Sequence, residues 1–262
     1  MDSGVHLLAL LEWQVALGAD EAIGDMPVDR YALTAEIARA PAATSVPLPV
    51  HSAPVAPSQG ATLLAAVAES RRLAAGAADR SGLAAAMAGY AQCDLRQGAR
   101  NLVFADGLPA ARVMIIGEAP GREEDIEGRP FVGKPGQLLD RMLAAIGLSR
   151  AATDPAQAVY LTTVLPWRPP SDRAPNPDEI AMLLPFLERH IALVDPKFII
   201  LMGNAPCQAL LDQTGITKLR GQWAEVLSKP ALPMVHPAHL LRQPAAKREA
   251  WADLLALKAR LQ

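Results

Sequence analysis

Three segments of the sequence combine acidic, aromatic or imidazole side chains with the glycines and prolines that shape loops. They are residues 117–133, 166–177 and 236–244. Their reactive or stacking side chains are Glu118, Glu123, Glu124, Asp125, Phe131, Trp167, His236 and His239, with Arg129, Arg168, Arg173 and Arg242 around them. Carboxylates and imidazoles can hold water, move protons or stabilise developing charge. These loops are therefore the first candidate for a ligand site.

Each of these loops follows a predicted strand. Residues 113–116 are four consecutive apolar residues before Gly117, typical of a strand buried on both faces. Further strands are predicted over residues 101–104, 159–165, 198–202, 222–227 and 234–235, and helices over 61–77, 82–91, 136–146, 179–194, 205–211 and 247–261. Strands that alternate with helices predict an α/β fold with three α/β/α layers and a central, mostly parallel four-stranded sheet. The loops would then gather at the carboxyl edge, where ligands bind in such sheets.

The amino-terminal part of the chain has a different composition. Residues 1–40 show helical periodicity over 7–23 and 29–38, which predicts an N-terminal helical arm. Residues 41–60 form a Pro/Ala-rich segment, typical of an extended linker. Residues 61–262 are predicted to form the catalytic or binding domain. The arm carries no recognisable chemistry, so packing on the domain or binding a protein partner are both open for it.

Composition limits the class of protein. The chain has 262 residues and a net charge of −2, which excludes a histone-like basic protein. Residues 1–99 carry 6 Lys and Arg against 10 Asp and Glu, whereas residues 100–262 carry 19 against 17. A polyanion site is therefore expected in the second part, built from a few well-placed cations. Two cysteines form neither a disulfide framework nor a four-cysteine metal site. The sequence has no apolar stretch of membrane-spanning length and no basic leader at its amino terminus, so we predict a soluble cytoplasmic protein with no membrane contact.

Taken singly, the motifs are ambiguous. The loop after Gly117 lacks the Gly-Lys-Ser/Thr ending of a P-loop, and its glycine spacing is wrong for a dinucleotide fingerprint. Gly-Glu-Ala-Pro-Gly after a strand is also compatible with a well-made turn. His236 beside Pro237 is equally compatible with a structural histidine. No clear metal cluster supports a third interpretation, a metal-dependent nucleotide-cleaving enzyme.

Four motifs in order are more specific. They are Gly117-Glu-Ala-Pro-Gly121, Gly128-Arg-Pro-Phe-Val-Gly133, Trp167-Arg-Pro-Pro170 and His236-Pro-Ala-His-Leu-Leu-Arg242. Together they resemble the uracil-DNA glycosylase superfamily, and family 4 in particular, over residues 90–261. The resemblance implies a monofunctional DNA repair enzyme that flips deoxyuridine out of DNA and cuts its N-glycosidic bond. No basic insertion with its own histidine follows Gly133, so the covalently trapping branch is not indicated.

The resemblance also implies roles for individual residues. Glu118, His236 and Asp125 would be catalytic, with Asp125 and Glu124 either helping to place water or forming a solvated charge run. His236 would donate to uracil O2 as the anionic base leaves. Gly117, Ala119, Phe131 and Thr163 would contact the substrate, with Phe131 stacked on the uracil ring. DNA contacts are expected from Arg129, Lys134, Arg168, Arg173, Leu240, Leu241 and Arg242, with the two leucines acting as an apolar wedge.

Two departures from the family matter. Its four iron–sulfur cysteines correspond here to Tyr90, Cys93, Trp167 and Leu183, so we predict no cluster and no other cofactor, with these side chains packed as a small core.

Thr163 stands where the family usually has an asparagine that pairs with uracil through a donor and an acceptor. Three outcomes follow: a slower uracil glycosylase, a changed base preference, or a DNA-binding relative with little activity. The expected partner is uracil-containing DNA, the expected state is a monomer, and the expected location is the bacterial cytoplasm at the nucleoid.

Overall fold

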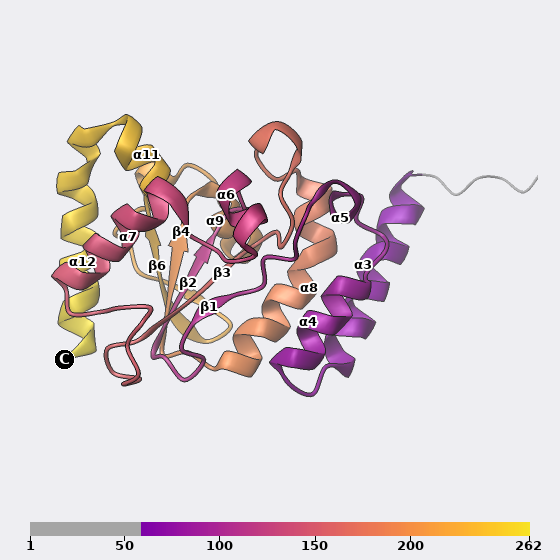
Figure 1. Ribbon diagram of the computed structural model, residues 1–262, viewed down its shortest axis with the longest axis horizontal. Coiled ribbons are helices and arrows are strands. Elements are labelled where there is room, and N and C mark those ends of the chain that lie inside the picture. The colour runs from indigo at the N-terminus through magenta and orange to yellow at the C-terminus, as the bar shows by residue number, and fades with distance from the viewer. Residues whose placement is uncertain (1–58) are drawn as a thin grey trace, which may run out of the picture. The chain divides into compact units, whose positions relative to one another are not determined.

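A six-stranded sheet forms the middle layer of the computed structural model, which describes residues 59–262 (Figure 1). The strand order is β1-β3-β2-β4-β6-β5. The four central strands, β3 (Val159–Thr163), β2 (Val113–Gly117), β4 (Phe198–Met202) and β6 (Lys229–Met234), are parallel. The edge strands β1 (Asp106–Gly107) and β5 (Ala224–Val226) are antiparallel to their neighbours. The predicted parallel core is confirmed, and the sheet gains two short edge strands.

Helices cover both faces of this sheet (Figure 1). One layer contains α3 (Gln59–Gly76), α4 (Arg80–Gly89) and α8 (Pro177–Val194), and the other contains α7 (Gly133–Ala145) and α12 (Lys247–Leu261). The remaining helices are α5 (Leu95–Gly98), α6 (Arg122–Glu127), α9 (Asn204–Leu211), α10 (Ile216–Leu219), α11 (Pro237–Arg242) and the 3₁₀ turns η1 (Pro170–Asp172) and η2 (Pro244–Ala246). The arm at residues 1–40 and the linker up to residue 58 lie outside the described residues.

Alternate residues of β2 belong to two separate apolar clusters. Met114 and Ile116 lie in the cluster that contains Phe186 of α8, whereas Val113 and Ile115 lie in the cluster that contains α7 and α12 residues. Side chains alternate across a strand, so a strand between two helical layers must be apolar at every position. This explains why β2 reads as an uninterrupted apolar run.

Two predictions of secondary structure need correction. Residues 101–104 do not form a strand, because their polar groups bond outside a ladder: the Val103 N–H donates to the Pro166 carbonyl at 2.8 Å, and the Thr162 hydroxyl donates to the Phe104 carbonyl at 2.7 Å. The 117–133 and 236–244 loops each contain a short helix, α6 and α11. Helix α6 follows β2 and helix α11 follows β6, so both lie at the carboxyl edge of the parallel strands.

Candidate active site

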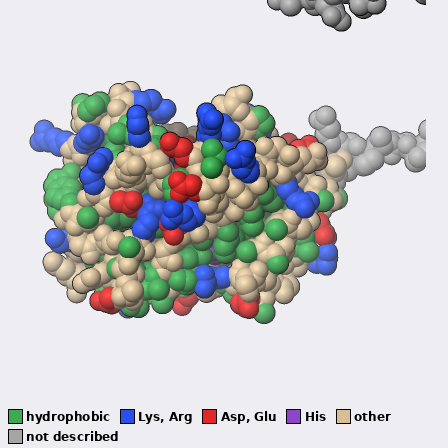
Figure 2. Space-filling view, viewed as in Figure 1, with side chains coloured by type: hydrophobic (Ala, Val, Ile, Leu, Met, Phe, Trp, Pro, Cys, Tyr) green, Lys and Arg blue, Asp and Glu red, His purple; other side chains and the backbone are tan. Residues whose placement is uncertain are grey.

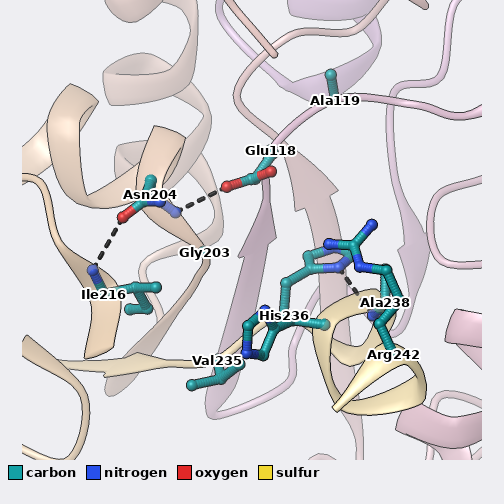
Figure 3. Close-up of a pocket in the computed structure, with 10 residues that line it drawn as sticks. Glu118, Ala119, Gly203, Asn204, Ile216, Val235, His236, Ala238 and Arg242 are labelled. Atoms are coloured by element: carbon teal, nitrogen blue, oxygen red, sulfur yellow. Dashed lines mark hydrogen bonds between the residues drawn. The ribbon is translucent and has the colours of Figure 1, made fainter. Parts of the chain in front are cut away.

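A cavity of about 270 Å³ lies at the carboxyl edge of the parallel strands (Figure 3). Residues that follow β2, β4 and β6 line it: Glu118, Ala119, Gly203, Asn204, Ile216, Val235, His236, Ala238, His239 and Arg242. A second cavity of about 280 Å³ shares Glu118, Ala119 and Arg242 and adds Pro169, Asp172 and Arg173 from the 166–177 loop. The expectation that the three loops gather at one edge of the sheet is therefore confirmed.

Glu118 is held by the start of helix α9. Its Oε1 accepts hydrogen bonds from the backbone N–H groups of Asn204 at 2.7 Å and Ala205 at 3.3 Å. Gly203, which precedes them, has φ +104°, and a Cβ there would collide with the Glu118 carboxylate. The amino end of a helix favours a negative charge, so this carboxylate is fixed in place. Its Oε2 makes no hydrogen bond to any other described residue and is available to water or a ligand.

His236 is the N-cap residue of α11, and its Nδ1 accepts a hydrogen bond from the Ala238 N–H at 3.2 Å. In the neutral imidazole the proton must then lie on Nε2, which makes that nitrogen a donor. Burial lowers the pKa of His236, and the Glu118 carboxylate opposes only part of this effect. The ring is therefore a neutral hydrogen-bond donor at pH 7.

Phe131 lies between the end of β2 and His236. Its ring is buried and stacks on the His236 ring, with centroids 5.7 Å apart and planes 23° apart. A Cβ on Gly117 would lie 2.6 Å from Phe131 Cζ, so only glycine permits this approach. Phe131 does not line the 270 Å³ cavity itself, but it stacks on His236, which does.

Glu124 fixes the backbone of Phe131. Its Oε1 accepts from the Phe131 N–H at 2.7 Å, and its Oε2 accepts from the Gly121 N–H at 2.5 Å. Burial raises the pKa of Glu124, and the two backbone bonds oppose that rise. Phe131 has φ +54°, a left-handed conformation that is costly for a large side chain. Both oxygens of Glu124 therefore bind the loop backbone, a structural role that the sequence did not predict for this residue.

Asp125 does not reach either cavity. It is buried, and its Oδ1 accepts from the backbone N–H groups of Arg100 at 2.8 Å and Asn101 at 3.2 Å. This carboxylate ties α6 to the segment before β1. The geometry therefore does not bear out the catalytic role predicted for Asp125, since the acidic run faces two directions once residues 122–127 coil into a helix.

Thr163 lies at the end of β3, beside the end of β2. Its hydroxyl donates to the Leu165 carbonyl at 2.7 Å, and the side chain is buried. Its methyl carbon Cγ2 lies 3.3 Å from the position that a Cβ on Gly117 would take. Thr163 therefore turns its methyl group toward Gly117 while its proton is already donated to the backbone.

The residues predicted to contact DNA divide into two groups. Arg242 is exposed and lines both cavities, Lys134 is exposed in the first turn of α7, and Leu241 is 41% exposed. By contrast, Leu240 is fully buried with Leu138, Val235 and Ala250, so in this conformation it cannot act as a wedge.

Three predicted arginines are paired with carboxylates: Arg168 with Asp172 at 2.6 Å, Arg173 with Glu179 at 2.5 Å and Arg129 with Glu127 at 2.8 Å. Figure 2 shows Lys and Arg side chains with acidic groups among them along the upper edge, where Figure 1 places α11 and α6. Binding of a polyanion at this edge would therefore rely on Arg242 and Lys134 first.

Asn204 is a site residue that the sequence did not single out as functional. Its backbone N–H binds Glu118, and its Oδ1 accepts from the N–H groups of Gly215 at 3.1 Å and Ile216 at 2.9 Å. It thereby joins the cavity wall at α10 to the carboxylate (Figure 3). Its position two residues after β4, at the carboxyl edge of the sheet, could have indicated a role in the site.

The fold and the site define an α/β protein with a carboxylate, a neutral imidazole and a stacked aromatic ring at the carboxyl edge of its sheet. A family model described as "Uracil DNA glycosylase superfamily" matches residues 104–255. The chain is 36% identical over 171 residues to the type-4 uracil-DNA glycosylase of Archaeoglobus fulgidus, covering 62% of this chain and 83% of that protein. It is 38% identical over 170 residues to the type-4 enzyme of Sulfurisphaera tokodaii, covering 60% and 73%. The chain therefore belongs to the uracil-DNA glycosylase superfamily.

The positions that correspond to the family's cluster ligands do not suit an iron–sulfur cluster. Tyr90, Cys93, Trp167 and Leu183 are all buried in one apolar cluster, as predicted. The Tyr90 hydroxyl donates to the Ala66 carbonyl at 2.9 Å, and its ring packs edge-on against Phe186 at 5.4 Å. Burial also raises the pKa of the Cys93 thiol, which disfavours the thiolate that a metal would need. Within residues 59–262, no group of three or more His, Cys, Asp or Glu is arranged to hold a metal ion.

Proposed function

We propose that this protein is a monofunctional DNA glycosylase that removes uracil from DNA and leaves an abasic site. The observation that carries the proposal is the juxtaposition of Phe131, His236 and Glu118 at the ends of β2 and β6. A flipped pyrimidine needs a stacking surface, a donor for its developing negative charge and a group that holds water. Membership of the family and similarity to proteins named type-4 uracil-DNA glycosylases support the same conclusion.

In the proposed reaction the bond between C1′ of the sugar and N1 of uracil breaks, and its electron pair leaves with the base. The His236 Nε2–H donates to uracil O2 and stabilises this anion, which an imidazole can do without carrying a charge. The free Oε2 of Glu118 holds the water whose oxygen adds to C1′. The proton that this water releases balances the charge of the departing uracil anion. Phe131 keeps the base stacked while the bond breaks.

Thr163 modifies this proposal. An asparagine amide can offer a donor and an acceptor to the uracil edge, whereas the Thr163 hydroxyl already donates to Leu165. We therefore infer that uracil is held with fewer hydrogen bonds than in relatives that carry asparagine, with a lower rate or a broader base range as the result. The alternative is a DNA-binding protein with little activity, which the replacement of asparagine by Thr163 would also explain.

We also propose that the protein works without an iron–sulfur cluster, because an apolar core fills the corresponding positions. Iron below a tenth of an equivalent in protein purified anaerobically is expected, and stoichiometric iron would contradict it. No helix among the described residues is long and apolar enough to cross a membrane. We also propose that the protein acts on DNA in the cytoplasm as a monomer. Binding of a protein partner by the arm at residues 1–40 stays a prediction.

The test is a single-turnover assay with enzyme in excess over oligonucleotides that contain uracil, hypoxanthine, xanthine or a thymine mismatch. The wild-type protein and Thr163→Asn are compared on each. Uracil excision by the wild type, increased in Thr163→Asn, supports the proposal. Binding without excision in both forms would favour the alternative, and excision of another base in preference to uracil would change the assigned substrate.

A further inference from the structure

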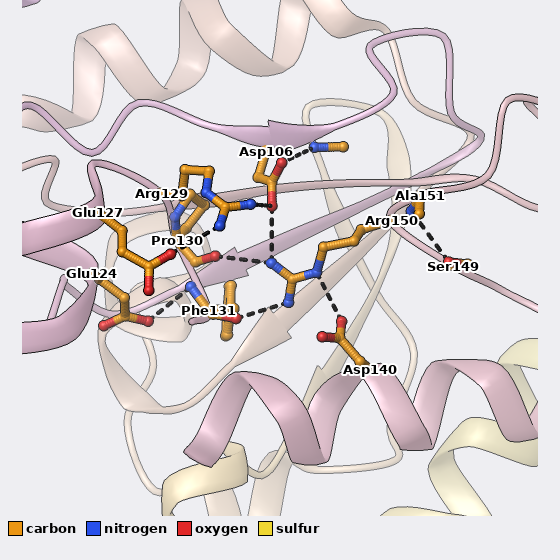
Figure 4. A network of polar contacts seen from close by, with 11 residues as sticks. Asp106, Glu124, Glu127, Arg129, Pro130, Phe131, Asp140, Ser149, Arg150 and Ala151 are labelled. Carbon is orange, nitrogen blue, oxygen red and sulfur yellow. Dashed lines mark hydrogen bonds and ion pairs between the residues drawn. The ribbon is translucent and has the colours of Figure 1, made fainter. Parts of the chain in front are cut away.

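Arg150 holds the loop that carries Phe131, although it lies 19 residues further along the chain (Figure 4). Its Nη2 donates to the Phe131 carbonyl at 2.8 Å, and its Nη1 donates to the Pro130 carbonyl at 3.1 Å. Two successive carbonyl groups of the Phe131 loop therefore converge on one guanidinium. A planar guanidinium presents several N–H groups in a fixed fork, so it can hold two backbone oxygens at once.

Two carboxylates from different elements fix Arg150 itself. Asp106 of β1 accepts from Nη1 at 3.0 Å, and Asp140 of α7 accepts from Nε at 2.8 Å. The Arg150 side chain is 14% exposed, whereas Asp140 is 47% exposed. The guanidinium thus connects the sheet edge, the Phe131 loop and helix α7 in one network (Figure 4).

This network acts on a strained residue. Phe131 has φ +54°, and a left-handed conformation persists in a large residue only where its surroundings determine it from several sides. Glu124 binds the Phe131 N–H, and Arg150 binds its carbonyl, so both polar groups of the residue are fixed by ionisable side chains. Small displacements of a group that contacts the reacting base are known to be costly in rate.

We propose that Arg150 is a positioning residue for base excision, which acts by setting the orientation of the Phe131 ring. This inference rests on the proposed function, because it assumes that Phe131 stacks on the flipped base. It predicts that the effect of Arg150 on the rate passes through Phe131. Lysine at this position keeps the positive charge but has a single nitrogen, which cannot serve two carbonyls and two carboxylates together.

The first test is a double-mutant cycle on single-turnover uracil excision with Arg150→Lys, Phe131→Ala and the double variant. Arg150→Lys is expected to lower the rate about tenfold in the wild-type background and less than about twofold in the Phe131→Ala background. The matched control is Arg141→Lys on the exposed side of α7, with no expected change. Equal losses in both backgrounds would show a general structural role and overturn the proposal.

The second test reads the ring position without using activity. The chain contains four phenylalanines, and all can be replaced with 4-fluorophenylalanine for ¹⁹F NMR. Phe131→Leu identifies the Phe131 resonance, and Phe186 and Phe198 serve as internal references. Arg150→Lys is expected to shift or broaden the Phe131 resonance while the references stay in place. An unchanged Phe131 resonance would overturn the proposal for Arg150, whether or not the wild type excises uracil. Absence of uracil excision by the wild type would instead refute the proposed function.

Discussion

Replacing Glu124 with glutamine should loosen the Phe131 loop without removing any apolar contact. The two carboxylate oxygens accept from two different N–H groups, those of Gly121 and Phe131. A glutamine amide has one oxygen, so one of the two N–H groups must face an NH₂ donor instead of an acceptor. Glu124→Gln is therefore a nearly isosteric change that deletes one hydrogen bond and opposes two donors.

The magnitude follows from the burial of this loop. Leaving a buried N–H without an acceptor costs about 1–3 kcal/mol, so the free energy of unfolding should fall by that amount. If Phe131 loses its bond, its left-handed backbone, which itself costs about 1–3 kcal/mol, is less well supported. The same energy at the stacked base corresponds to a loss of about 5- to 150-fold in excision rate.

Two assays on one set of proteins separate stability from chemistry. Urea unfolding followed by tryptophan fluorescence gives the change in free energy, and single-turnover excision gives the rate. Glu127→Gln is the matched control, because Glu127 lies on the same helix and pairs with Arg129 at an exposed position. An exposed pair of this kind contributes about 0–1 kcal/mol, so this variant should resemble the wild type.

The refuting results are distinct. A Glu124→Gln protein as stable and as active as the wild type would show that the two backbone bonds do not hold Phe131. Unchanged stability with a rate loss of more than about a thousandfold would indicate that Glu124 takes part in the chemistry, since the loss exceeds what one unsatisfied bond can explain.

Three further predictions concern other parts of the domain. Thr163→Asn should raise the rate of uracil excision about tenfold or more in the single-turnover assay, and an unchanged rate would remove this position from substrate binding. The same change should lower the free energy of unfolding by about 1–3 kcal/mol, because asparagine adds one buried heavy atom. Leu240→Ala should lose about 2–5 kcal/mol of stability by urea unfolding, whereas Leu241→Ala should keep its stability and excise uracil from duplex DNA more slowly; the reverse pattern would assign the wedge to Leu240. Burial lowers the pKa of His190 to about 3, so below pH 6.5 the unfolded state gains a proton that the folded state cannot, and stability falls as the pH drops. His190→Gln, which can still bond the Tyr160 hydroxyl, should flatten this fall by about 1.4 kcal/mol per pH unit between pH 6 and 4; parallel curves would contradict the buried neutral histidine.

The sequence predicted the parallel core well because its strands are short apolar runs. Residues 198–202 were predicted as a strand and form β4 with the same bounds, and 247–261 were predicted as a helix and form α12. Two strands were harder to predict. The edge strand β1 has only two residues, and the inner strand β6 was predicted only at its end, over residues 234–235, because it contains Pro230 and Pro233, which cannot donate to a ladder. Their pairing depends on neighbours distant in the sequence.

The site was predictable where residues follow a strand directly. Glu118 directly follows β2 and His236 lies two residues after β6, so the parallel topology places both at one edge of the sheet. Asp125 was predicted to be catalytic, but its carboxylate binds the backbone of Arg100 and lines neither cavity. A run of acidic residues does not reveal that it forms a helix with one carboxylate turned inward. Arg150 belongs to none of the sequence motifs, so the sequence did not indicate a role for it. Its contacts depend on two loop carbonyls and two carboxylates that come together only in the folded chain.

The most direct measurement of the central claim is release of free uracil, detected by mass spectrometry, from a uracil-containing oligonucleotide with enzyme in excess. The wild type should release uracil and leave an alkali-sensitive abasic site. His236→Ala should bind the same DNA with similar affinity and release uracil about 100- to 1,000-fold more slowly, as expected for loss of one donor to a developing anion. No uracil from the wild type, or equal release from the variant, would contradict the assignment of this pocket.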